Sequence, residues 1–343
     1  MILANGFLRT ICVLTVLLTS SFSAAAETAA EFYKGKVVKL VVGFGAGGGY
    51  DTYARMLAPH LEQHLDATIV VENRPGGGGI LALNQVSAAK PDGLTIMIIS
   101  AATSAFSQIT QAEGVRFDLN RLGFLGRVID DKRVLVLGSA SPYRTIEDIL
   151  NSPRAVLFGG TSRTASSAAA SAFISEALDL NAKMVVGYKS SKEIALATLR
   201  GEVDGFTISE SSARRYVRDE GMFAAAVVSR EPSALHPGVP TIFELTTLSP
   251  EQEWWLDYCD ALFSLGRALV TTPDIPAERL EFLQQAVRDV LTDEKVIAEA
   301  QAKKNPLNYA APTEAGPMVD RVIGGLTVEE LATVRRVTQD KYN

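Results

Sequence analysis

The chain has 343 residues, of which 47% are hydrophobic and 21% are charged, and its formal net charge is −6. This length exceeds the size at which a single hydrophobic core stops growing, so two lobes are expected. The acidic balance and the lack of a basic stripe argue against a nucleic-acid partner. Because the overall charge does not attract anions, an anionic ligand would have to be held by local groups.

Residues 1–26 have the three-part pattern of a secretory signal. Arg9 gives the positive start, residues 11–18 are apolar, and a small-residue stretch offers a cleavage point after Ala26. The apolar run is far shorter than the roughly 20 residues that a membrane-spanning helix needs. We therefore expect an exported protein, periplasmic in a Gram-negative cell. A retained N-terminal anchor is the alternative.

The next hundred residues alternate between strand and helix patterns. Continuous apolar runs of buried-strand length occupy residues 37–44, 68–71 and 94–100. Apolar residues at helical spacing occupy residues 51–65 and 80–89 between them. This β-α-β-α-β order predicts a parallel sheet covered by helices on both faces.

A second α/β block begins near Arg133. The predicted strands are 133–138, 155–158, 184–188, 205–208 and 223–228, with a helix of small residues over 165–178. A proline-rich passage follows, and the end of the chain reads as helices over 277–292, 294–303 and 313–323. The sequence contains no low-complexity linker, so strand crossings near Arg133 and Leu262 are expected to join the lobes.

Two glycine-rich loops dominate the sequence, at residues 43–51 and 73–79. Each lies between the carboxyl end of a predicted strand and the amino end of a predicted helix. Glycine lets the backbone approach a ligand closely, and the first amides of a helix suit an anion. Loops on neighbouring strands would face each other where open α/β sheets bind ligands. Tight turns alone would explain one glycine but fit two such runs poorly, so we expect ligand contact.

The same residues also match a dinucleotide fingerprint, Gly43-x-Gly45-x-x-Gly48, with Glu72 at the end of the second strand. Asp51 argues against this alternative because it would place a carboxylate beside the pyrophosphate. An exported protein also has little access to nicotinamide cofactors. The sequence therefore predicts no cofactor.

Other catalytic and metal signals are sparse. His60 and His64 have the spacing of zinc ligands, but Glu62 points to the opposite side of that helix, so a solvated helix face is the better interpretation and no metal is expected. There is no Gly-x-Ser-x-Gly motif. We predict a binding protein without catalytic residues, and a buried Cys259 that behaves as a small hydrophobe.

A polar cluster follows the strand 155–158 in the second block, at the position that mirrors the glycine loops. It consists of Thr161, Ser162, Arg163 and Thr164. Hydroxyls and an arginine at a helix start could bind a group of the ligand from the opposite wall. A surface role for Arg163 is equally compatible with the sequence. Tyr188 lies in the next strand-end loop.

Two stretches, VVGFGAGGGYDTYARMLAPHL and TIVVENRPGGGGILALNQVSAAKPDGLTIMI, resemble the Bug-type periplasmic receptors of tripartite tricarboxylate transporters. That family has a glycine loop ending in Asp, then Val-Glu-Asn-Arg/Lys-Pro-Gly, then Pro-Asp-Gly. Here Asp51, Glu72, Asn73, Arg74 and Pro75 stand in step with it. The resemblance extends more weakly to about Gly316.

The resemblance implies an α/β fold of the type II periplasmic binding protein class, with two mainly parallel sheets and a cleft between the lobes. The lobes would comprise residues 27–132 plus 262–343, and residues 133–261. It implies a monomer that captures a small carboxylate and delivers it to transporter membrane subunits. The implied ligand-binding residues are Phe44, Gly45, Ala46, Gly47, Gly48, Gly49, Tyr50, Asp51, Asn73, Gly76, Gly77, Gly78, Gly79 and Ser100 in the first wall, and Thr161, Ser162, Arg163, Thr164 and Tyr188 in the second.

The sequence also departs from the family pattern. Gly43 and Ala46 stand where the family usually has proline, and the second-lobe loop lacks the usual histidine. The distal group of the ligand is therefore not predicted. A receptor that signals to a sensor kinase would have the same pocket, so that alternative to transport stays open.

Overall fold

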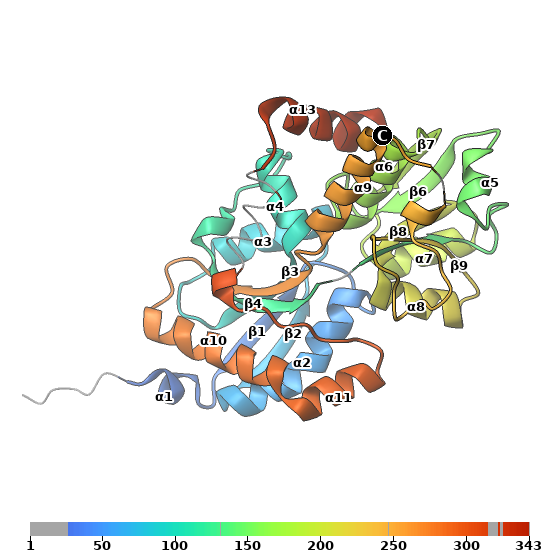
Figure 1. Cartoon of the computed structure of the whole chain (residues 1–343). Helices are drawn as coiled ribbons and strands as arrows, with labels where there is room; N and C mark the ends of the chain where they lie inside the picture. The colour runs from blue at the N-terminus through green and yellow to red at the C-terminus, as the bar shows by residue number, and fades with distance from the viewer. Residues whose placement is uncertain (1–26, 131, 246, 315–321, 323–324, 343) are drawn as a thin grey trace, which may run out of the picture.

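A computed structural model of the chain describes residues 27–130, 132–245, 247–314, 322 and 325–342. The predicted secretory signal and most of the predicted helix at 313–323 lie outside these residues. The described residues contain two five-stranded sheets, each covered by helices on both faces (Figure 1). The predicted α/β fold class with two mainly parallel sheets is confirmed.

The first sheet has the strand order β2-β1-β3-β10-β4. Its strands are β1 (Val37–Val42), β2 (Thr68–Asn73), β3 (Thr95–Ser100), β4 (Gly123–Ile129) and β10 (Arg267–Thr271). β1 is parallel to β2 and β3, whereas β10 is antiparallel to β3 and β4. The three parallel strands are those predicted from the sequence.

Alternation along these strands divides the side chains between two cores, because successive residues of a strand point to opposite faces. Leu40 and Ile98 pack with α2 (Gly49–Leu65) and α10 (Ala277–Thr292) on one face. Val41 and Met97 pack with the opposite face's helices. The helices on that opposite face are α3 (Ile80–Ser87) and α4 (Ala101–Ile109). Two further helices, α1 (Ala29–Tyr33) and α11 (Glu294–Ala302), pack at the edge of the face that α2 covers.

The second sheet has the order β7-β6-β8-β5-β9. Its strands are β5 (Arg133–Leu137), β6 (Val156–Gly160), β7 (Ala182–Val186), β8 (Gly205–Ser209) and β9 (Phe223–Val228). β6 is parallel to β7 and β8, and β5 runs antiparallel to both of its neighbours. Its helices are α5 (Ile146–Leu150), α6 (Ser166–Ala177), α7 (Ser191–Leu199), α8 (Glu210–Asp219) and α9 (Pro250–Phe263).

We refer to the first sheet with its helices as lobe 1 and to the second as lobe 2. The chain passes from β4 in lobe 1 to β5 in lobe 2 between Ile129 and Arg133, and returns between α9 and β10. These two passages lie where the sequence predicts the crossings. The exact lobe boundaries remain predictions.

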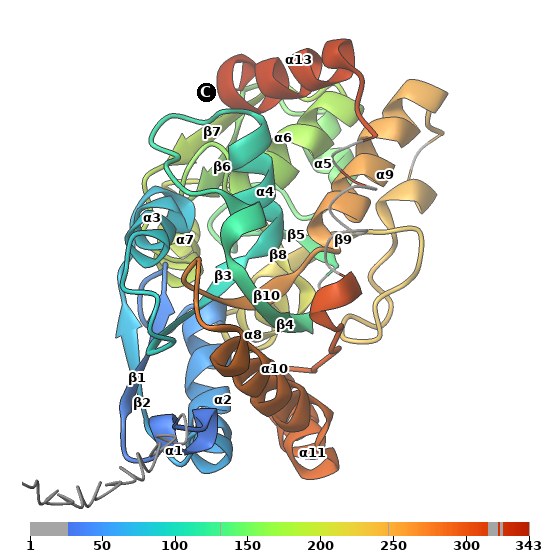
Figure 2. The same ribbon diagram turned by 90° about the vertical axis from the view of Figure 1, so that its left-hand side faces the viewer.

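The C-terminal helix α13 (Val328–Arg336) and the following turn, η5 (Val337–Lys341), lie against α6 of lobe 2 (Figures 1 and 2). The Met184 amide donates to the Tyr342 carbonyl at 2.6 Å, and Lys341 Nζ lies 2.6 Å from Glu176 Oε2. Arg335 also donates to the Ile109 carbonyl in α4 of lobe 1. The sequence assigned residues 262–343 to lobe 1, yet this last segment contacts lobe 2 because its apolar side covers α6.

Cys259 on α9 is fully buried, as predicted. Burial raises the pKa of its thiol, because the thiolate would lose its hydration in the apolar core. Among the described residues, none of the helices combines the length and the apolar character that crossing a membrane requires.

Candidate ligand-binding site

The two glycine loops lie side by side at the carboxyl edge of the first sheet. A Cβ added at Gly43 would lie 2.8 Å from the Gly79 Cα, so only glycine permits this approach of the two backbones. A Cβ at Gly79 would lie 3.5 Å from the ring of Phe44, which stacks on Tyr50 with ring centres 4.3 Å apart. The loops therefore form one surface, as their positions after neighbouring strands predict.

Asp51, in the first turn of α2, connects the two loops. Its carboxylate accepts hydrogen bonds from the Gly47 amide at 2.8 Å, from Arg55 Nε at 3.0 Å and from Asn73 Nδ2 at 2.9 Å. Burial raises the pKa of Asp51, but the hydrogen bonds from Arg55, Gly47 and Asn73 together outweigh it and leave the pKa below its usual value. This carboxylate therefore holds the loop conformation while ionised.

Several amides of the first loop bind acceptors of the protein itself. The Gly45 amide donates to the Lys189 carbonyl of lobe 2 at 2.9 Å, and the Gly48 amide donates to the Gly45 carbonyl at 3.4 Å. Together with the Gly47–Asp51 hydrogen bond, these contacts occupy three amides that the sequence offered to a ligand. The glycines of the first loop therefore also allow the two lobes to approach each other closely.

The structure is closed, because both loops touch lobe 2. A Cβ at Gly45 would lie 3.3 Å from the Ser190 Cβ, and a Cβ at Gly78 would lie 2.5 Å from Ser162 Oγ. Arg215 on α8 donates from Nη2 to the Gly47 carbonyl at 3.1 Å. Residues of both predicted walls thus meet across the cleft.

A cluster of hydroxyl groups forms a second contact between the lobes. Ser166 Oγ, at the start of α6, lies 3.0 Å from Ser100 Oγ and 2.8 Å from Thr103 Oγ1 at the start of α4. Ser107 Oγ donates to Thr164 Oγ1 at 2.8 Å. These bonds exist only when the lobes are together, so they stabilise the closed form.

A cavity of about 60 Å³ lies inside this contact. Most of its lining side chains are hydroxyl-bearing or apolar, and they come from both lobes. The lining residues are Phe44, Thr103, Arg133, Thr161, Ala165, Ser166, Ser167, Ser191, Ile194, Thr207 and Ile208.

The amino end of α6 opens on this cavity. Its N-cap position is Ala165, whose methyl side chain carries no acceptor for the first-turn amides. The Ser166 amide donates instead to Thr103 Oγ1 of lobe 1 at 3.1 Å. A helix start with a non-capping residue at a cavity suits an anionic group.

The structure places several of the predicted site residues in four different settings. Phe44 and Thr161 line the cavity, and the glycines of both loops lie at the contact between the lobes or beside it. Ser100 and Thr164 take part in the hydroxyl cluster. Arg163 is exposed and donates to the Gln339 carbonyl at 3.1 Å, so the structure places it against the C-terminal segment.

Only Phe44 and Thr161 of the lining residues were predicted as ligand contacts, and the others include the polar side chains of Thr103, Arg133 and Thr207. Thr103 lies in α4, and Arg133 and Thr207 lie on the neighbouring strands β5 and β8. Arg133 begins an apolar strand pattern, which was an available signal, whereas Thr207 lies in the middle of its strand.

A larger hollow of about 330 Å³ lies at the outer edge of the contact between the lobes. Arg214 and Arg218 of α8 border it on one side, and Lys303 and Lys304 at the end of α11 border it on the other. Two of its cations, Arg218 and Lys303, already form ion pairs with Asp219 and Glu299. The smaller cavity is the candidate ligand site, because Phe44 and Thr161 from the two predicted walls line it.

The histidine pair considered as a zinc site is placed differently from a metal centre. His60 Nε2 lies 3.0 Å from Glu299 Oε2 on α11. Within the described part of the chain, the structure contains no group of three or more His, Cys, Asp or Glu side chains that could hold a metal ion.

Two α/β lobes that close on a cavity lined from both sides are the arrangement of periplasmic binding proteins, and solved structures share this fold. The match to the periplasmic binding protein BugD covers 89% of this chain and 98% of the BugD chain, with a TM-score of 0.73 and 21% sequence identity. MatC from Rhodopseudomonas palustris, solved with bound malate, covers 89% and 99%, with a TM-score of 0.71 and 20% identity. An R. palustris protein solved with adipate covers 88% and 97%, with a TM-score of 0.72 and 18% identity.

Within this class, the family described as tripartite tricarboxylate transporter family receptor matches residues 53–305. The chain therefore belongs to that receptor family, as its glycine loops indicate. Relatives include the protein BugT of Bordetella pertussis, which is 26% identical over 227 residues, or 64% of this chain and 69% of BugT. A UPF0065 protein of Bordetella bronchiseptica is 24% identical over 298 residues, or 85% of this chain and 83% of the relative.

Proposed function

We propose that this protein captures a small carboxylate in the cavity between its lobes, in the periplasm, and presents it to the membrane subunits of a tripartite tricarboxylate-type transporter. The observation that carries the proposal is that α6 begins at a cavity lined from both lobes, where its N-cap Ala165 offers no side-chain acceptor to the first turn. Family membership and the ligands of MatC and the adipate-bound neighbour point in the same direction.

Binding would proceed from an open form to the closed one. The carboxylate would contact the helix end first, and closure would then form the hydroxyl cluster of Ser100, Thr103 and Ser166 across the cleft. Charge-assisted hydrogen bonds of about 1.5–3 kcal/mol each could supply micromolar affinity after the cost of association.

A catalytic role is not proposed. The cavity of about 60 Å³ is smaller than a dinucleotide and so gives the cofactor-binding alternative no support. The motif of Gly43, Gly45 and Gly48 instead serves contact between the two loops and between the lobes.

A thermal-shift screen of carboxylates tests the proposal. At a free ligand concentration of 100 times Kd, binding is expected to stabilise the protein by about 2.7 kcal/mol and to raise Tm on the order of 5 °C. The matched controls are the corresponding amides, and chloride at equal ionic strength. The proposal fails if no carboxylate raises Tm, or if the amides raise it equally.

A further inference from the structure

Basic side chains gather in the hollow of about 330 Å³ at the outer edge of the contact between the lobes. They come from α8 of lobe 2 and from the end of α11 of lobe 1, and they are Arg214, Arg215, Arg218, Lys303 and Lys304. Among the described residues that line the hollow, Asp219 is the one carboxylate. The chain as a whole has a formal net charge of −6, so the hollow reverses the sign of the charge locally.

The protein's own carboxylates do not neutralise all of this charge. Arg218 and Lys303 form ion pairs on exposed side chains, where such a pair stabilises little. Within the described part of the chain, the side chains of Arg214 and Lys304 form neither an ion pair nor a hydrogen bond. Like charges that are brought together repel each other, so an anion between them would offset a cost of closing the lobes.

The hollow is complete only when the lobes are together. Arg215 Nη2 donates to the Gly47 carbonyl of lobe 1 at 3.1 Å. A Cβ added at Gly49, in the first turn of α2, would lie 2.5 Å from Ser212 Oγ of α8, and both residues line the hollow. Opening would separate the arginines of α8 from the lysines of α11. An anion held by both sets therefore binds the closed form more tightly than an open one.

The size and the charge of the hollow together indicate a class of ligand. Guanidinium and ammonium groups both bind phosphate oxygens, and a guanidinium can do so with two parallel hydrogen bonds. A volume of about 330 Å³ lies at the lower end of the range of small-molecule sites, about 300–1,000 Å³. A compact anion with several negative charges matches both properties, whereas an anion with one charge would leave most of the cations unneutralised.

We propose that this hollow is a second anion-binding site, which takes a small phosphate anion of several charges, such as pyrophosphate, and stabilises the closed form. The site is separate from the cavity proposed for the carboxylate and does not depend on that function. Since both sites favour the closed form, occupation of one raises the affinity of the other by the same factor.

Isothermal titration calorimetry with pyrophosphate, in a buffer without divalent cations, tests the site. The wild type is expected to bind with a Kd below about 1 mM. The double variant Arg214→Gln, Lys304→Gln is expected to bind about 10-fold more weakly, or about 3-fold for each partly exposed charge. The matched control is Lys295→Gln with Arg200→Gln. It removes one exposed cation from α11 and one from lobe 2, neither of which lines the hollow, so the net charge changes equally. The control should stay within about 2-fold of the wild type.

Gly78→Ala tests whether the anion needs the closed form. Its Cβ would lie 2.5 Å from Ser162 Oγ of lobe 2, and Gly78 is not among the described residues that line the hollow. This variant is expected to bind pyrophosphate at least about 5-fold more weakly, because less of the protein reaches the closed form. Gly77→Ala, whose added Cβ would contact only its own loop, should bind pyrophosphate like the wild type.

Three results would each overturn the inference. The first is a wild type that does not bind pyrophosphate. The second is equal weakening in the two double variants, which would mean that the overall field attracts an adventitious ion only. The third is unchanged affinity in Gly78→Ala, which would mean that the anion does not bridge the lobes. The thermal-shift screen of carboxylates tests the proposed function separately, so failure of one leaves the other standing.

Discussion

Replacing Gly78 by alanine is expected to lower carboxylate affinity about 30-fold, or roughly 2 kcal/mol. Gly78 has φ +67°, and an added Cβ would lie 2.5 Å from Ser162 Oγ and 3.0 Å from the Ala165 Cβ of lobe 2. Ala165 is the N-cap of α6, so this atom cannot move without moving the helix. The new methyl group would therefore keep the lobes apart and disfavour the closed form that holds the ligand. Calorimetric titration measures the change.

Gly77→Ala is the matched control for this change. Gly77 belongs to the same loop and has φ +56°, so alanine suffers similar backbone strain there. Its Cβ would make only an ordinary contact of 3.6 Å with Ile80 in its own loop. The two variants should lose similar thermal stability without ligand, and only Gly78→Ala should lose affinity. Equal affinities in the two variants would show that the Gly78–Ser162 contact is irrelevant to binding.

The elements that could be predicted from the sequence are those whose partners follow closely in the chain. β1, β2 and β3 and the helices between them have clear apolar periods, and their parallel pairing follows from β-α-β order. β10 gives no such signal. It comes back to lobe 1 more than a hundred residues after β4, and it pairs antiparallel with both β3 and β4. Local periodicity does not encode that partner.

The same limit applies to the candidate site. The glycine loops and Thr161 follow strand ends, so their position at the cleft is readable from local order. Arg133 lies at the cavity because β5 occupies the place between β8 and β9. Arg163 lies in a polar loop after a strand, so the sequence was compatible with a ligand contact. In the structure it donates instead to the Gln339 carbonyl of the C-terminal segment. Sheet order and the packing of the last helix decide these placements.

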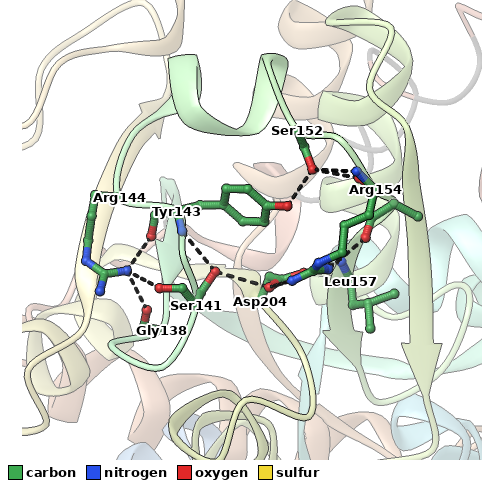
Figure 3. Close-up of polar contacts among 9 residues, drawn as sticks. Gly138, Ser141, Tyr143, Arg144, Ser152, Arg154, Leu157 and Asp204 are labelled. Carbon is green, nitrogen blue, oxygen red and sulfur yellow. Dashed lines mark hydrogen bonds and ion pairs between the residues drawn. The ribbon is translucent and has the colours of Figure 1, made fainter.

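Asp204 is a buried carboxylate whose hydrogen bonds are expected to stabilise lobe 2. It immediately precedes β8, and Figure 3 shows its carboxylate beside Arg154, Leu157 and Ser141. The cavity-lining residues Thr207 and Ile208 lie further along the same strand. Its buried carboxylate accepts two hydrogen bonds from Arg154, at 2.7 and 2.8 Å, and one from the Leu157 amide at 2.9 Å. Ser141 Oγ donates to it at 3.1 Å, so the carboxylate ties the loop after β5 to the start of β6.

Asp204→Ala is expected to reduce the free energy of unfolding by about 3 kcal/mol, because it leaves four donor groups around a buried site without their acceptor. Ligand affinity of the folded variant should stay within about 2-fold of the wild type, since the hydrogen-bond partners of Asp204 are not among the described residues that line the cavity. Urea unfolding and calorimetry measure the two quantities. Asp219→Ala, which breaks an exposed ion pair with Arg218, is the control and should leave stability unchanged.

The pH dependence of this effect follows from the pKa of Asp204. Burial raises that pKa, but the hydrogen bonds from Arg154, Leu157 and Ser141 outweigh it, so the folded-state pKa lies below the ordinary 3.8. A depressed folded-state pKa gives stability that is fully present above the unfolded-state value and is lost as the pH falls through the folded-state one. The difference in unfolding free energy between wild type and Asp204→Ala should therefore be constant from pH 5 to 7 and shrink below about pH 4. A difference that grows on acidification would mean that the carboxylate is destabilised by burial rather than held by Arg154.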